Sequence, residues 1–499
     1  MSSIESRPGA RRRVSRRLRR ASLHTLLSVA GAVTGATAFA QEPVAPPAPE
    51  APPAPAPEAP APEAPAASAA TPASPPADTP PGGSPSERQA LEAEIAAALG
   101  QDSPAPAPPP PPASAPSPLR LLDLSFDLVG AAGGSSASES DMRRLQGGGH
   151  DPKNRGFTVQ NVELTFAGVV DPYLRGDANI VLLIDETGET VVELEEAYLT
   201  TLDLPLNLQL EAGQFFTEFG RLNPTHPHTW DFVDQPVVNS RFFGPDGLRN
   251  PGLQLSWLAP LPFFAELTLS AQDAHGETAP SFRGEPGETL GGRTLGESEV
   301  RGLDDLLYMA RLETSFDLAE DLTLVGGLSS LFGPNASADE ARTSIYGVDL
   351  YAKWRPLSNN QGWPFLAWQT ELMLRRYDAG QVLAESGGAV ASPTTLDDYG
   401  LYSQLTWGFA RPWVAGVRYD RAWGEDAAFG TGDAAYDTES DPLRDSRQRY
   451  SAVLSYYPSE FSKLRLQYNY DRAQFISDAA HSAFLQFEIL FGAHGAHKF

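Results

Sequence analysis

The sequence predicts an all-β protein: a transmembrane antiparallel β-barrel of about 16 strands, preceded by a Pro-rich disordered segment and a short helix. Three observations support this fold class. Apolar and polar residues alternate along many segments after residue 119, short and long connections alternate between these segments, and aromatic residues cluster near the segment ends. Period-two alternation is typical of a strand with one apolar face. Asymmetric connections and aromatic girdles are typical of outer-membrane barrels.

Residues 1–40 are expected to form a signal peptide. Eight arginines lie between Arg7 and Arg20, the run Leu26–Ala36 is apolar, and Ala38-Phe39-Ala40 is a small-x-small cleavage site before Gln41. A membrane anchor would need about 20 apolar residues, which is more than this run supplies. We therefore expect export, signal-peptide removal and delivery to the bacterial outer membrane.

The segment between Gln41 and Pro118 holds 26 of the 46 prolines, so it cannot form a core. It divides into a Pro/Ala-rich linker (41–83), a short amphipathic helix (84–100) and a second Pro-rich linker (101–118). Ser84 is expected to cap the helix, and Leu91, Ile95 and Leu99 are expected to form one apolar stripe. Three roles fit this stripe: pairing with copies of itself, docking on the barrel, or a frayed helix within a linker.

Residues 119–499 are expected to form the barrel. In Leu122–Leu128 every second residue is apolar, and segments near ten residues long suit strands that cross a membrane at a tilt. Sixteen segments begin near Leu121, Phe157, Gly176, Val191, Leu206, Gly252, Phe263, Leu307, Leu322, Thr343, Trp363, Tyr399, Trp413, Gln448, Ser462 and Ala483. This even number places both chain ends on the periplasmic side.

The connections fall into two classes. The tight ones, at residues 171–173, 203–205, 260–262, 317–321, 355–362, 410–412 and 458–460, all follow even-numbered segments. Long polar runs, at residues 131–155, 219–251, 274–306, 378–398, 424–447 and 471–482, all follow odd-numbered segments. The first class is expected to form periplasmic turns and the second to form external loops.

The composition excludes several function classes. Residues 119–499 hold 28 Lys plus Arg against 53 Asp plus Glu, a net charge of −25. Nucleic acid is therefore not an expected partner, and the field of the barrel favours cations over anions. The chain has no cysteine, no G-x-S-x-G elbow, no H-E-x-x-H motif and no P-loop, so it is not expected to be an enzyme.

Several motifs carry a family resemblance. They lie at residues 210–216, 219–223, 226–236, 253–260 and 492–499, the third reading His-Pro-His-Thr-Trp-Asp-Phe-Val-Asp-Gln-Pro. These motifs resemble bacterial outer-membrane proteins labelled zinc-regulated TonB-dependent outer membrane receptor, which implies a link to zinc. More distantly the barrel is similar to the phosphate-selective porins, which implies sixteen strands and a homotrimer. Sixteen strands behind a Pro-rich tract, with no folded plug, predict passive diffusion without TonB.

Loop 219–251 is the third external loop, which in general porins folds into the lumen and narrows it. Its candidate constriction residues are Arg221, Arg241, Arg249, Asp231 and Asp234, and its candidate metal ligands are His226 and His228. Two imidazoles and a carboxylate suit zinc, nickel or copper. Pro227 is expected to extend the segment and to turn the two rings apart. The alternative role for both histidines is to brace the loop against Trp230 and Phe232.

Two further groups of residues are of interest. His494 and His497 offer a second metal pair at the periplasmic end, or a tail that caps the barrel rim. On the strand that begins near Val191, Glu193 and Glu195 share one face and are expected to face the lumen. Glu196 is expected on the other face, near a rim or at a subunit interface.

The favoured function is an outer-membrane porin-like channel for passive passage of small hydrophilic solutes or ions, surrounded by outer-membrane lipid and linked to zinc supply. Two alternatives stay open: a structural outer-membrane protein tethered through the Pro-rich segment, and a TonB-dependent metal receptor. No cofactor other than zinc is expected.

Overall fold

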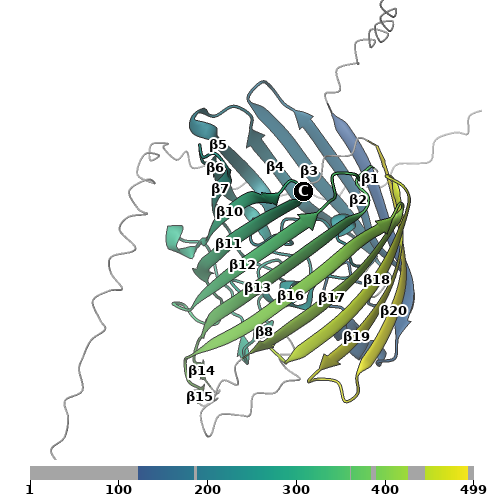
Figure 1. The fold of residues 1–499 in the computed structure, drawn as a ribbon. Helices are drawn as coiled ribbons and strands as arrows, with labels where there is room; N and C mark the ends of the chain where they lie inside the picture. The colour runs from purple at the N-terminus through teal and green to yellow at the C-terminus, as the bar shows by residue number, and fades with distance from the viewer. Residues whose placement is uncertain (1–121, 185–187, 360, 384–388, 425–443, 493–499) are drawn as a thin grey trace, which may run out of the picture. The chain divides into compact units, whose positions relative to one another are not determined.

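The computed structural model describes residues 122–184, 188–359, 361–383, 389–424 and 444–492 (Figure 1). The predicted signal peptide, both Pro-rich linkers and the helix at residues 84–100 lie outside these residues, as do His494 and His497. Within the described part of the chain, no helix is long and apolar enough to cross a membrane.

Sixteen antiparallel strands form one closed barrel, in which β1 lies beside β20 (Figure 1). Their bounds are β1 (Asp123–Ser135), β2 (Gly156–Val169), β3 (Leu174–Ile184), β4 (Thr190–Thr201), β5 (Leu208–Phe216), β6 (Arg249–Leu258), β7 (Phe264–Gln272), β10 (Leu307–Ala319), β11 (Leu322–Pro334), β12 (Arg342–Trp354), β13 (Phe365–Ala379), β16 (Thr394–Ala410), β17 (Trp413–Gly424), β18 (Arg447–Ser459), β19 (Ser462–Ala473) and β20 (Ala480–Gly492).

The predicted fold class is confirmed. Each predicted segment begins within five residues of an observed barrel strand, and each predicted tight connection lies at a short turn. The largest difference is at β16, which begins at Thr394 rather than near Tyr399. β1 is longer than expected and continues through Ser135, because it stays paired with β20 as far as Ser482.

The external loops contain short elements of their own. These are helices α2 (Glu139–Leu145) and α3 (Val237–Phe243), the 3-10 turns η2 (Pro227–Thr229) and η3 (Leu303–Asp305), and the two-stranded sheets β8 (Thr289–Leu290) with β9 (Arg293–Thr294) and β14 (Val382–Leu383) with β15 (Ala389–Ala391). A further 3-10 turn, η1 (Pro205–Asn207), lies at a short turn. The sequence pattern does not predict α2 or α3, because each helix is only seven residues long.

Side chains alternate between the two faces of the barrel wall. In β20 the side chains of Leu485, Phe487 and Ile489 are exposed on the outer face, whereas those of Ser482 and Gln486 are buried on the inner face. Exposed aromatic side chains lie at the short-turn end, as expected of an interfacial girdle: Trp257, Phe263, Trp354, Trp407, Phe409 and Trp413. The protein is therefore a β-barrel of the bacterial outer membrane.

Loops fill part of the barrel interior at the long-loop end. One buried apolar cluster joins Phe219, Phe242 and Phe243 of the β5–β6 loop to Phe282 of the next external loop and to Ile345 of β12. A second cluster joins Met142 of α2, Val233 of the β5–β6 loop and Phe484 of β20. Segments far apart in the sequence thus pack together inside the ring of strands.

Candidate functional site

The loop between β5 and β6, residues 217–248, folds into the barrel as predicted; we call it the constriction loop. Asn223 fixes its base, because the Asn223 amide donates to the carbonyl oxygens of Thr217 (2.8 Å) and Leu248 (3.0 Å) and accepts from the amide of Leu248 (2.9 Å). One buried side chain therefore holds both ends of the loop together.

The constriction loop docks on the strands opposite its base. Glu371 of β13 accepts hydrogen bonds from the amides of Arg221 (3.1 Å) and Leu222 (2.8 Å) and from the hydroxyl of Tyr402 (2.6 Å). α3 then packs against β16 and β17 and ends at Gly244. Glycine is needed there because φ is 87° and a Cβ would lie 2.5 Å from the carbonyl oxygen of Glu277.

Asp234 anchors the loop to the basic wall of β17–β19. Its carboxylate is fully buried and accepts hydrogen bonds from Arg418 (2.6 Å), Arg449 (2.9 Å), Gln467 (2.9 Å) and Asn469 (2.5 Å). Burial by itself opposes ionisation, but the charges of Arg449 and Arg418 and the hydrogen bonds lower the pKa of Asp234 to about 2. The carboxylate is therefore ionised wherever the protein is folded near neutral pH.

His226 and His228 lie against an acidic wall formed by β1–β4, which only β20 separates from the basic wall. η2 begins directly after His226, so the two rings lie nearly parallel, with centroids 5.7 Å apart and an interplanar angle of 21°. The expectation that Pro227 turns the rings apart is wrong, because the chain is extended at His226 and forms a 3-10 turn from Pro227 onward. Both Nδ1 atoms lie near one carboxylate, that of Glu163 on β2.

A β-bulge on β4 supplies two adjacent carboxylates to the same side. Asn179 of β3 pairs with Glu196, and Ile180 pairs with Leu194, so Glu195 is the extra residue. The bulge turns Glu195 and Glu196 both toward the lumen, where they are buried. The expectation that Glu196 lies on the outer face is therefore wrong, because strict alternation does not hold across a bulge.

Glu195 and Glu196 contact the two ring nitrogens of His226. The Nδ1 atom of His226 lies 2.9 Å from the Glu195 carboxylate, and the Nε2 atom lies 2.9 Å from the Glu196 carboxylate. Both nitrogens face acceptors, which is the pattern of a doubly protonated imidazolium. Burial lowers the pKa of His226, but the charges of Glu163 and Glu195 outweigh it and hold the pKa well above 6.5.

His228 occupies a different environment. Its Nδ1 atom lies 3.1 Å from the Glu163 carboxylate and 3.4 Å from the Asp127 carboxylate of β1. Burial lowers the pKa of His228, and the charges of Glu163 and Asp127 raise it above 6.5. His228 therefore faces two carboxylates from neighbouring strands, which is a donor set able to hold a metal ion.

The predicted constriction residues separate into a half-buried group and a buried group. Arg221 and Asp231 are half-buried; the Arg221 guanidinium lies 4.0 Å from the centre of the Tyr351 ring. Arg241 and Asp234 are buried and hold the loop in place. Arg249 is the first residue of β6 rather than part of the loop, because it pairs with Phe216, and its guanidinium lies 2.8 Å from Glu193.

No sequence motif marks Asp127, Glu163 or His150 as parts of this site. His150 lies in the loop after α2, and its Nε2 atom is 3.8 Å from the carboxylates of Glu195 and Asp246. Asp127 lies in the first predicted strand, at one of the alternating positions that are expected to face the lumen. This position is the local sequence feature that points to Asp127. Its partners come from other strands and a distant loop.

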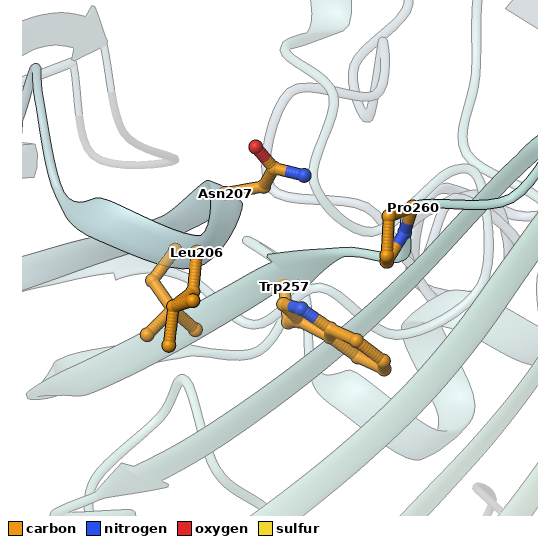
Figure 2. A pocket seen from close by; sticks show the side chains of 5 residues that line it. Leu206, Asn207, Trp257 and Pro260 are labelled. Carbon is orange, nitrogen blue, oxygen red and sulfur yellow. The ribbon is translucent and has the colours of Figure 1, made fainter.

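A separate surface pocket lies at the short-turn end, where Leu206, Asn207, Leu208, Trp257 and Pro260 line it (Figure 2). Leu206 and Trp257 are exposed apolar side chains. The pocket is at the opposite end of β5 from the constriction loop, and its apolar lining suits contact with lipid at the membrane interface. It offers no charged group for binding a polar solute.

No protein-family model matches the sequence. Among solved structures, the chain is similar to the outer membrane channel DcaP of Acinetobacter baumannii (13% identity, TM-score 0.48, 74% of this chain and 97% of that chain). It is also similar to an anion-selective porin from Comamonas acidovorans (8% identity, TM-score 0.44, 74% and 99%).

Among curated sequences, the chain is 34% identical over 408 residues to a protein of Aquifex aeolicus (strain VF5) described as uncharacterized. The match covers 76% of this chain and 80% of the relative. The chain therefore belongs to the same family as this Aquifex aeolicus protein.

Proposed function

We propose that the protein is a porin-like channel through which small hydrophilic solutes and ions diffuse passively across the outer membrane. The observation that carries this proposal is a closed barrel whose inward polar side chains keep contact with water. Glu313 of β10 is 29% exposed and Asp177 of β3 is 16% exposed on the inner face. A barrel of sixteen strands is wide enough to enclose such an aqueous lumen.

The half-buried part of the constriction loop would define the narrow region of the channel. Arg221 and Asp231 lie there with Tyr351 and Lys353 of β12, and Asp231 accepts a 3.2 Å hydrogen bond from Gln404 of β16. Positive and negative groups face one another across this region. Such an arrangement orients polar solutes that pass through. The preference for cations over anions is then set by the net negative charge of the whole barrel.

Planar-bilayer recording in a salt gradient tests this function. The purified native protein is expected to conduct with a modest preference for cations, and Asp231→Asn is expected to reduce that preference. Glu320→Gln is the matched control, because it removes one carboxylate at an exposed turn outside the loop. A native barrel that folds but never conducts would contradict the channel and favour the structural alternative, a protein tethered through its Pro-rich segment.

The link to zinc supply is a second part of the proposal. It is supported by the two imidazoles and the carboxylates of β1, β2 and β4 that surround them. We also propose that neither an enzymatic activity nor energy transfer from TonB is involved, because a passive lumen requires neither.

A further inference from the structure

The carboxylate of Asp127 is buried in the barrel wall without a hydrogen bond. The residue is 3% exposed, and neither side-chain oxygen has a hydrogen-bond partner within the described residues. Leaving a buried carboxylate without hydrogen bonds is costly in free energy. The Nδ1 atom of His228 is 3.4 Å from this carboxylate but lies closer to Glu163, at 3.1 Å, so a metal cation bonded directly to Asp127 would lower the cost further.

The strand register adds a second destabilising feature. Asp127 of β1 and Glu163 of β2 are directly opposed in the antiparallel ladder, and both side chains point inward. Like charges that face each other across a ladder repel. The nearby cation Lys463 is already held by Glu488 at 2.6 Å and donates a 2.8 Å hydrogen bond to the carbonyl oxygen of His228.

Two of the three separations between the donor atoms match those around a small divalent cation. Bonds of about 2.0–2.1 Å in a tetrahedral zinc site place neighbouring ligand atoms about 3.3 Å apart. The Nδ1 atom of His228 lies 3.1 Å from Glu163 and 3.4 Å from Asp127. The ligand atoms of all three residues lie within 4.8 Å of one another.

We propose that Asp127, Glu163 and His228 bind one divalent transition-metal cation of the zinc class, which displaces the Nδ1 proton of His228 to solvent and leaves a fourth position open to water. The mixture of imidazole and carboxylate ligands suits this class of metal. The neighbouring His226 has a different role, because Glu195 and Glu196 satisfy both of its nitrogens. His226 braces the loop, and His228 supplies the loop's metal ligand.

A metal ion at this site joins the constriction loop to the first two strands. His228 belongs to the loop, whereas Asp127 and Glu163 belong to the wall. Bound metal therefore holds the loop in its docked position and reduces fluctuations of the channel current. The effect on current rests on the proposed channel function, but metal binding itself does not.

Calorimetric titration of the folded, detergent-solubilised protein with Zn²⁺ tests the site. The native protein is expected to bind one zinc ion per chain here, and Asp127→Asn, Glu163→Gln and His228→Ala are each expected to weaken binding by at least about 10-fold. Asp177→Asn is the matched control, because it neutralises an inward carboxylate that is paired with Arg175 at 2.8 Å. His494→Ala with His497→Ala controls for zinc held by the C-terminal tail.

Thermal unfolding supplies a second measurement. In the presence of a chelator, Asp127→Asn is expected to be at least as stable as the native protein, because the variant lacks the carboxylate that has no hydrogen bond. In the presence of zinc, the midpoint temperature of unfolding of the native protein is expected to rise above that of the variant. The proposal is overturned if the native protein binds no zinc, or if Asp127→Asn binds as tightly as the native protein. It is also overturned if the tail variant alone abolishes binding. If the protein binds zinc but does not conduct in a bilayer, the proposed channel function is contradicted and the proposed metal site is retained.

Discussion

Asp234 of the constriction loop accepts a 2.6 Å hydrogen bond from Arg418 of β17, and both side chains are almost completely buried. Arg449 of β18 contacts the second oxygen of the same carboxylate at 2.9 Å. Asp234 lies eight residues after His226 and six residues after His228, and these two histidines contact the acidic wall of β1–β4. The loop therefore bridges two oppositely charged walls of the barrel.

Replacing Asp234 should release the loop from the basic wall. Asp234→Ala removes the carboxylate that Arg418 and Arg449 share. Each guanidinium keeps a second carboxylate at 2.8 Å, Asp420 and Asp471 respectively, so the cost should be smaller than the about 3–5 kcal/mol of leaving a buried charge unpaired. We expect trypsin to cut the variant faster after Arg241, which is buried in the native loop. Asp339→Asn, an exposed residue of another external loop, should leave the rate of cleavage unchanged. Equal cleavage of native protein and Asp234→Ala would show that the anchor does not hold the loop.

The lowered pKa of Asp234 predicts that the free energy of unfolding depends on pH. Its pKa is about 2 in the folded protein, below the usual 3.8, so its contribution is fully present above about pH 4 and is lost as the pH falls toward 2. The contribution is on the order of 2 kcal/mol. Urea unfolding of native protein and Asp234→Asn between pH 2 and pH 6 would measure it. The free-energy difference between the two proteins should shrink as the pH falls, and a constant difference would contradict the prediction.

Gly400 of β16 allows α3 to approach the wall closely. A Cβ at this position would lie 2.1 Å from Cγ2 of Val238, which is too close for any pair of carbon atoms. Gly400→Ala should displace α3 and expose Arg241 to trypsin, and a second change, Val238→Gly, should partly restore protection. Gly326→Ala is the matched control, since its nearest neighbour would be 3.9 Å away. Normal protection in Gly400→Ala would argue against this packing.

The amphipathic stripe at residues 84–100 leads to a prediction about assembly. We propose a homotrimer in which these helices add contacts between subunits. Deleting residues 84–100 should lower the temperature at which the trimer dissociates in native gel electrophoresis. A trimer of unchanged stability would show that the barrel walls alone hold the assembly, and a native protein that is monomeric would exclude the trimer.

The sequence predicts the barrel well because its signals are local. Alternation over a few residues marks each strand, and the Asp, Pro and Gly residues at the turns mark their ends. For this reason β20 and the turn before β17 are placed correctly from sequence. The length and position of the constriction loop follow from the same signals.

The candidate site is less predictable because its partners come from distant segments. His226 and His228 are evident as a motif, but Glu163 lies more than 60 residues earlier and Asp127 about 100 residues earlier. Only the register of β1 with β2 places these two carboxylates together. The bulge that turns Glu196 inward likewise has no mark in the local sequence pattern.

We propose that the constriction loop sets the bore of a passive channel. Single-channel recording should compare the native protein with a variant in which residues 226–242 are replaced by a short Gly-Ser segment, after both are shown to keep the heat-resistant migration of a folded barrel. We expect the native protein to conduct and the shortened variant to conduct more, because the loop no longer crosses the lumen. An absence of conductance in both proteins would contradict the proposed channel, and equal conductance in both would contradict the proposed role of the loop.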